Sequence, residues 1–286
     1  MAMNTTGAAG AWLPDSTGNL IIQPVGRESV ALQALGGPVL VGETSSSYRV
    51  PLVTADPSAG WVAEGAEIPL SDAALGEVSK KFSKIAGLTR ISAELADDSD
   101  PAAAEQIGAG IARDIARTLD AAFFGTNGGS ADQPEGLEDL TGANVITTSG
   151  TAWENVDPFI EALYGAEEVG ATVGAFVLNP TDALAVSRLK ESDTSNRTLL
   201  TPDATEASRR LLAGVPMLVS PAVTAGTAWG IPADGRLQVA VRQDVQVESD
   251  RSVFFSSHEV AVRGIMRATI VAPHEAALQR IDLATA

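Results

Sequence analysis

The strongest structural pattern in the sequence is a long amphipathic helix, predicted from about Pro101 to Phe124. Its large apolar residues recur every four positions and form one stripe: Ile107, Ile111, Ile115, Leu119 and Phe123. Asp100 can cap the N-terminus, Pro101 suits the first turn because it has no N–H to leave unpaired, and Gly125 ends the helix. At ~1.5 Å per residue the helix is roughly 36 Å long, so it can serve as the spine of a domain.

Residues 60–95 predict a long β-hairpin that has no core of its own. Two strands are expected, joined by a polar tip that contains Pro69. The first half offers few apolar residues to anchor it, and the second half carries Lys80, Lys81 and Lys84, three of the chain's four lysines. The alternation around Phe82 favours an exposed strand face for these lysines, with a polyanion site as the alternative. Such a hairpin needs another surface to lie on, and a second copy of the chain is the most direct candidate.

The rest of the chain mixes helices and strands without a regular alternation, which predicts an α+β fold. Residues 1–50 indicate an extended arm with short strands at 20–22 and 39–41. Further helices are expected from Asp157-Pro158 and after Asn179, a good N-cap residue. Further strands are expected at 175–178, 217–219, 237–241, 245–247, 259–262 and 265–271.

Composition and charge exclude several functional classes. The chain has no cysteine, which excludes disulfides and thiolate metal sites, and no apolar run long enough to span a bilayer, so no membrane role is predicted. A net charge of −17 argues against direct, sequence-specific binding of nucleic acid, because such binders place clustered Lys and Arg on the phosphates. A shell that merely encloses nucleic acid is still allowed, since an acidic wall keeps its contents mobile.

A search for catalytic residues yields no constellation. The two histidines, His258 and His274, belong to no nucleophile motif and are interpreted as surface or turn residues. The Gly-rich stretch 125–129 follows a helix instead of opening one, so it is a cap and not a phosphate site. Adjacent carboxylates such as 97–98 and 167–168 point to different helix faces and are interpreted as solvated charge. No enzyme activity, cofactor or metal site is predicted.

Several short motifs, in this order and spacing, resemble the Hong Kong 97-type major capsid proteins of tailed bacteriophages. They are Trp61-Val62-Ala63-Glu64-Gly65-Ala66, Ile85-Ala86-Gly87-Leu88, Ala121 to Gly128, Pro134-Glu135-Gly136-Leu137, Phe176 to Pro180, Gly214-Val215-Pro216, and a stretch from Arg263 and Arg267 to Pro273. The resemblance covers nearly the whole chain. It implies an N-terminal arm (1–51), an E-loop hairpin (52–91), a peripheral domain (92–158 and 251–286) with a spine helix at 101–124, and an axial domain (159–250).

The resemblance also implies a function. The chain would be a major capsid protein that self-assembles into pentamers and hexamers of an icosahedral shell enclosing phage double-stranded DNA. It would be assembled in the host bacterial cytoplasm and reside in the virion. Partners would include a portal protein and possibly a decoration protein. A separate scaffolding protein is expected, because Met1 leads almost directly into the arm. An encapsulin-type nanocompartment shell is the alternative, and a hydrolase with an unrecognised site near His258 is a remote one.

In the family's type member, a lysine and an asparagine of different subunits form a covalent isopeptide bond with the assistance of a glutamate. Laid along this sequence, those three roles fall near Ile68, Ser256 and Arg263, none of which can perform them. No such crosslink is therefore expected. Non-covalent contacts between subunits are predicted instead, either through acidic residues of the hairpin or through its lysines: Glu64, Glu67, Asp72, Lys80, Lys81 and Lys84.

Overall fold

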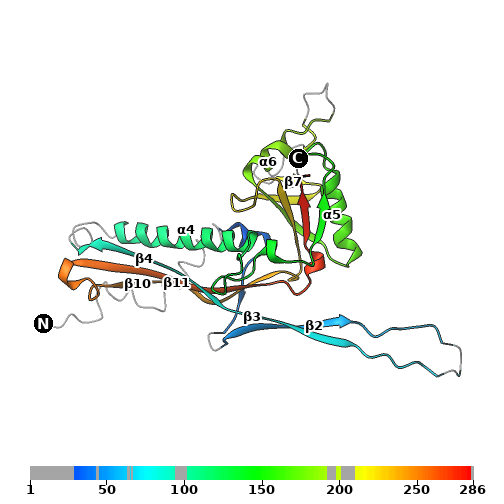
Figure 1. The fold of residues 1–286 in the computed structure, drawn as a ribbon, viewed down its shortest axis with the longest axis horizontal. Coiled ribbons are helices and arrows are strands. Elements are labelled where there is room, and N and C mark those ends of the chain that lie inside the picture. Colours follow the sequence, from blue (N-terminus) through cyan, green and yellow to red (C-terminus); the bar gives the residue numbers. More distant parts are fainter. Residues whose placement is uncertain are drawn as a thin grey trace.

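The computed structural model describes residues 29–42, 45–62, 65, 67–93, 102–191, 198–200 and 210–284. Figure 1 shows an elongated body formed by a long helix on a sheet, a lobe at one end of the body, and a hairpin that projects away from both. Within these residues no helix is long and apolar enough to cross a membrane.

The body is built on helix α4 (Ala102–Phe124), which confirms the predicted spine helix. It packs against a sheet of order β1-β10-β11-β4. The strands are β1 (Val39–Leu40), β4 (Ser83–Ser92), β10 (Gln238–Asp250) and β11 (Glu259–Val271). The C-terminal part of the apolar stripe on α4 is fully buried: Ile115, Leu119 and Phe123. Helix and sheet approach so closely at Gly264 that a Cβ there would lie 2.3 Å from Ile111 Cγ2.

The lobe contains a second sheet, of order β5-β12-β9-β6-β8-β7. Its strands are β5 (Asn144–Thr147), β6 (Val173–Leu178), β7 (Leu211–Leu212), β8 (Val215–Val219), β9 (Thr227–Pro232) and β12 (Gln279–Asp282). Helices α5 (Asp157–Glu168) and α6 (Pro180–Ser187) bury apolar side chains against it in one core. The Asn179 side chain accepts a hydrogen bond from Thr181 N, which confirms the predicted N-cap. Short 3-10 turns lie at Leu137–Asp139, Phe255–Ser257 and Glu275–Ala277.

The hairpin exists, but its strands differ from those predicted. Strand β2 (Ser47–Ala55) pairs antiparallel with β3 (Ala74–Lys81), so the first strand lies upstream of residue 60. The described residues between 56 and 73 form the connection between these strands and contain no strand. The last part of the predicted hairpin is β4, which pairs with β11 in the body. The sequence pattern therefore placed the first strand too far along the chain, and it could not specify which strand pairs with β4.

The region expected to be an extended arm contains a short buried helix, α2 (Val30–Ala34). Its N-terminus is held by Asp120 of α4, whose carboxylate accepts hydrogen bonds from Ser29 Oγ, Val30 N and Ala31 N. Because α2 also contacts β6 and β8, it lies where body and lobe meet. Residues 1–28, including the strand expected at 20–22, lie outside the described residues.

Three further differences concern the strands. Two separate short strands were predicted within 237–247 and two within 259–271, but each segment forms a single strand, β10 and β11. Register shifts between Val241 and Gln246 lie where the sequence suggested a break in β10. Strand β9 was not expected, because Gly230 interrupts its apolar run. Strand pairing also differs from the predicted axial domain (159–250). Strand β10 lies within these residues but belongs to the body sheet, whereas β5 and β12 lie outside them and belong to the lobe sheet. The division into named domains remains a prediction.

Candidate assembly surface

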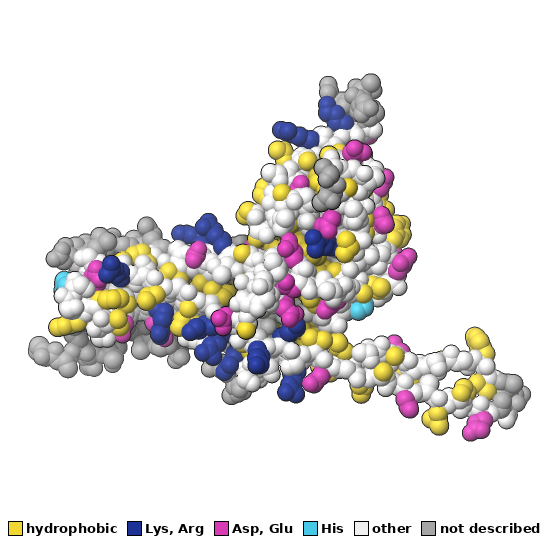
Figure 2. Space-filling view, in the orientation of Figure 1, with side chains coloured by type: hydrophobic (Ala, Val, Ile, Leu, Met, Phe, Trp, Pro, Cys, Tyr) yellow, Lys and Arg dark blue, Asp and Glu magenta, His cyan; other side chains and the backbone are white. Residues whose placement is uncertain are grey.

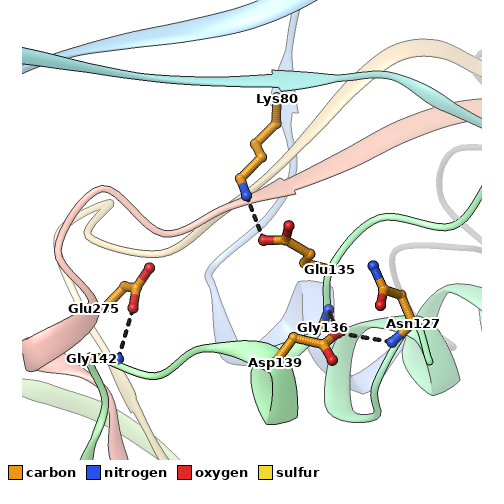
Figure 3. Close-up of polar contacts among 7 residues, drawn as sticks. All are labelled: Lys80, Asn127, Glu135, Gly136, Asp139, Gly142 and Glu275. Carbon is orange, nitrogen blue, oxygen red and sulfur yellow. Dashed lines mark hydrogen bonds and ion pairs between the residues drawn. The ribbon is translucent and has the colours of Figure 1, made fainter. Parts of the chain in front are cut away.

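The hairpin is attached to the body through a few contacts at its base. Tyr48 Oη donates a hydrogen bond to Gln238 Oε1 at 2.9 Å, joining β2 to the end of β10. Lys80 Nζ on β3 forms an ion pair with the Glu135 carboxylate, as Figure 3 shows. Thus Lys80, one of the predicted inter-subunit residues, already has a partner within its own chain.

The loop that presents Glu135 is held against the end of α4. Asp139 accepts hydrogen bonds from Asn127 N at 2.8 Å and from Gly136 N at 2.9 Å (Figure 3). It also accepts a hydrogen bond from the Thr126 hydroxyl. Partial burial raises the pKa of Asp139, but these three hydrogen bonds outweigh that effect and hold the pKa below its ordinary value. A Cβ at Gly136 would lie 2.1 Å from the Gly125 carbonyl oxygen, so only glycine fits there. Glu135 is therefore presented from a fixed position.

Beyond its base, the hairpin exposes large apolar side chains that touch no core. They are Val53 on β2, Leu75 on β3, and Trp61, Val62, Ile68 and Leu70 in the connection. Trp61 and Leu70 are completely exposed, and Figure 2 shows apolar side chains along the projecting hairpin. Exposed apolar groups gathered on one element are typical of a protein–protein interface. The predicted contacts were based on the charges of this segment and left out these apolar residues, although Trp61 and Leu70 can be recognised in the sequence.

The predicted contact residues fall into two separate groups. Glu67 and Asp72 are exposed in the connection between β2 and β3, while Glu64 lies outside the described residues. Lys81 is exposed at the end of β3, close to the hairpin base, and Lys84 is exposed on β4. The described acidic candidates thus lie in the hairpin connection, whereas the basic candidates lie at the hairpin base and on the body sheet.

Lys84 belongs to a positively charged part of the body sheet. It is the cross-strand neighbour of Arg267 on β11, and both lie on the sheet face opposite α4. Like charges in this arrangement destabilise a sheet. The Arg267 Nε atom is also buried without a hydrogen-bond partner. An anionic group supplied from outside would relieve both penalties.

Neither histidine is placed for catalysis. His258 is an exposed residue in a left-handed conformation (φ 53°) just before β11, and the neighbouring Ser257 hydroxyl contacts Glu259 Oε2 and the Phe254 carbonyl instead. His274 Nδ1 lies 2.8 Å from Arg236 Nη1. In the described part of the chain no group of three or more His, Asp or Glu residues could hold a metal ion.

Comparisons with known proteins agree with this architecture. A family model described as "Phage capsid family" matches residues 9–283. No match was found among curated proteins. Among solved structures, the chain is similar to the capsid of a native GTA particle, with 21% identity, TM-score 0.69 and 100% of each chain covered. It is also similar to structures from Microbacterium phage Oxtober96 (18% identity, TM-score 0.71) and Mycobacterium phage Adephagia (17%, 0.70), each covering 90% of this chain and 91% of the other.

These similarities settle the fold class and the broad role. The architecture is the α+β Hong Kong 97-type fold that the sequence resemblance implied, with a spine helix on a sheet and a long projecting hairpin. The family consists of structural proteins of virus capsids and not of enzymes. The family model covers almost the entire sequence, and this chain therefore belongs to the phage capsid family.

Proposed function

We propose that this chain is a major capsid protein that self-assembles into pentamers and hexamers of an icosahedral shell around double-stranded phage DNA. The observation that carries the proposal is the hairpin, which projects from the body and exposes apolar side chains that no described residue of its own chain covers. Membership of the phage capsid family supports the same conclusion. The net charge of −17 suits a container whose wall does not grip its DNA.

The hairpin connection is the proposed inter-subunit contact. It combines exposed Trp61 and Leu70 with the carboxylates of Glu67 and Asp72. The Lys84–Arg267 pair on the body sheet of a neighbouring copy offers charges of the opposite sign. Exposed ion pairs contribute only about 0–1 kcal/mol each, so burial of the apolar side chains would supply most of the affinity and the charges would select the docking position.

We also propose that the shell is held together without isopeptide crosslinks. By the family resemblance, the roles of the crosslinking lysine, asparagine and glutamate fall near Ile68, Ser256 and Arg263, and Arg263 pairs with Glu248 on the adjacent strand. An isopeptide bond needs a side-chain amine and a carboxamide, and neither is present at these positions. Assembled particles boiled in SDS should therefore release a single band near 29 kDa. A ladder of covalent multimers would refute this part of the proposal.

Electron microscopy of the purified chain tests assembly directly. Closed shells are expected for the wild type, and the double variant Trp61→Ser/Leu70→Ser should lose them while the unassembled chain keeps its circular dichroism spectrum. The variant Trp61→Phe/Leu70→Met retains the apolar surface and should still assemble. Shells formed normally by the serine variant would show that the hairpin is not the contact. A wild-type chain that stays monomeric at every concentration would reject the proposed function.

Three finer parts of the proposal concern partners and contents. We propose a portal protein and a separate scaffolding protein as partners, with assembly in the host cytoplasm and final location in the virion. A decoration protein is a further possible partner. The alternative of an encapsulin-type shell shares this fold but encloses a protein cargo. Particles recovered from their natural producer distinguish the two, because nuclease-protected DNA supports a phage head and a co-purifying enzyme supports the nanocompartment.

A further inference from the structure

The loop that follows α4 contains the only Asn-Gly pair in the sequence, Asn127-Gly128. An asparagine side chain can react with the main-chain nitrogen of the next residue, because the two groups are already held together and close a five-membered succinimide ring. Glycine favours this reaction, since it has no Cβ to crowd the attacking nitrogen. The other asparagines among the described residues precede a β-branched residue or proline: Asn144, Asn155 and Asn179.

The loop connects both reacting groups to suitable hydrogen-bond partners. The attacking nitrogen, Gly128 N, donates a hydrogen bond to Thr126 Oγ1 at 3.0 Å, and the same hydroxyl donates to the Asp139 carboxylate. The oxygen of the group under attack, Asn127 Oδ1, accepts a hydrogen bond from Gly129 N at 2.8 Å. The nitrogen therefore has a path along which to lose its proton, and the oxygen has a donor that stabilises it as it becomes negative.

The same loop holds these groups in a fixed arrangement. The Asp139 carboxylate accepts from Asn127 N (Figure 3) and from Gly136 N as well as from Thr126, and these hydrogen bonds favour its ionised form near neutral pH. Thr126 follows the last turn of α4, and Asp139 ends the 3-10 turn at Leu137–Asp139. The folded chain thus keeps the proton path in place, whereas an unfolded chain would form it only rarely.

We propose that Asn127 is a site of succinimide formation and deamidation, promoted by the Thr126 hydroxyl and the Asp139 carboxylate. Gly128 N attacks Asn127 Cγ while its proton passes through the Thr126 hydroxyl to Asp139, and negative charge develops on Oδ1. The bond from Cγ to Nδ2 then breaks, and this nitrogen takes up the proton and leaves as ammonia. Water opens the ring at either carbonyl, which leaves aspartate or isoaspartate at position 127 and a chain about 1 Da heavier. Water is the only other reactant, and the reaction does not depend on self-assembly.

The reaction changes the loop that supports the base of the hairpin. Either product places a new carboxylate beside that of Asp139, and isoaspartate also adds a methylene group to the main chain. Asp139 holds Gly136 N, and the neighbouring Glu135 forms the ion pair with Lys80 on β3. Repulsion between the two carboxylates should displace this loop, so deamidation of Asn127 should weaken the attachment of the hairpin to the body.

Peptide mass spectrometry of the purified chain, stored at constant neutral pH and temperature, measures the conversion of Asn127 over time. The folded wild type should convert at least about tenfold faster than the same chain denatured in guanidinium chloride. Thr126→Val removes the hydroxyl but keeps the shape of the side chain, and it should slow the folded chain about tenfold. Thr126→Ser keeps the hydroxyl and should stay within about threefold of the wild type. Asn144 and Asn155 serve as internal controls that remain unconverted.

Two results would overturn the proposal: a folded wild type that converts no faster than the denatured chain, or equal rates for Thr126→Val and the wild type. Thr126 is exposed, and circular dichroism melting identifies a variant that fails to fold. Ion exchange separates converted from unconverted chain, because deamidation adds one negative charge. Hydrogen exchange at the hairpin base should be faster in the converted chain, and equal exchange would show that the reaction does not reach the hairpin.

Discussion

Replacing Asp120 by alanine should loosen the joint between body, lobe and N-terminal segment. The side chain is only 6% exposed and lies on α4, where it accepts hydrogen bonds from Ser29 Oγ (2.6 Å), Val30 N (2.9 Å) and Ala31 N (3.1 Å). Without the carboxylate, two backbone N–H groups at the start of α2 lose their acceptor. The Ser29 hydroxyl still accepts from Leu32 N, so α2 keeps one capping interaction.

The expected loss can be worked from these contacts. A buried donor left without a partner costs about 1–3 kcal/mol, so two donors cost about 2–6 kcal/mol. Removing a buried carboxylate also returns part of its desolvation penalty, which lowers the expected loss for Asp120→Ala to about 2–4 kcal/mol. Urea unfolding of the unassembled chain, followed by tryptophan fluorescence, measures this loss, because Trp229 on β9 is completely buried in a core that it shares with residues of α2 and α4. The control Asp114→Ala, at an exposed position of the same helix, should change stability by less than about 0.5 kcal/mol.

The pH dependence gives an independent check of the same reasoning. Burial raises the pKa of Asp120 above its ordinary value, and the hydrogen bonds from Ser29, Val30 and Ala31 only partly oppose this. The folded state therefore binds this proton more tightly than the unfolded state, so acidification favours folding at this site. Relative to Asp120→Asn, the wild type should gain stability as the pH falls through the raised native pKa. Two results would refute the argument. One is a loss of less than about 0.5 kcal/mol in the free energy of unfolding for Asp120→Ala. The other is a wild type that loses stability relative to Asp120→Asn when the pH is lowered.

Three further predictions concern other contacts. Gly264→Ala places a Cβ 2.3 Å from Ile111 Cγ2 and should lower the free energy of unfolding in urea by about 1–3 kcal/mol. Adding Ile111→Ala should recover part of this loss, and strictly additive effects of the two substitutions would contradict the clash. Asp139→Asn should destabilise the chain near neutral pH but only slightly in acid, because the stability that comes with the lowered pKa of Asp139 is lost as the pH falls. The same difference in melting temperature between wild type and variant at both pH values would contradict this prediction. Lys80→Ala or Glu135→Ala should cost at most about 1 kcal/mol, yet hydrogen exchange at the hairpin base should rise; unchanged exchange would show that the ion pair does not hold the hairpin.

The three longer helices, α4, α5 and α6, could be predicted from the sequence because their signals are local, whereas the short helix α2 was not expected. The stripe from Ile107 to Phe123 recurs within one element, and the Asn179 cap depends on a residue two positions away. The body helix matches its expected bounds within one residue, and α5 and α6 begin where they were expected to begin. None of these predictions required knowledge of which segments meet in space.

Strand pairing could not be predicted in the same way. Strand β12 lies between β5 and β9, although Ile281 is far in sequence from its partners Ile146 and Ala228. Alternating patterns identify an extended segment but not its neighbour, so Trp61 and Val62 were assigned to a strand that actually lies upstream. The candidate surface was predicted in part: the hairpin was identified, but its exposed apolar residues and the Lys80–Glu135 pair depend on the three-dimensional arrangement.

The exposed hairpin also bears on how the free chain behaves in solution. Its uncovered apolar side chains favour association, while a net charge of −17 makes free copies repel one another. Added salt shortens the range of that repulsion to about 8 Å at 0.15 M, but it leaves apolar attraction in place. The critical concentration at which free copies begin to form a shell should therefore fall as ionic strength rises.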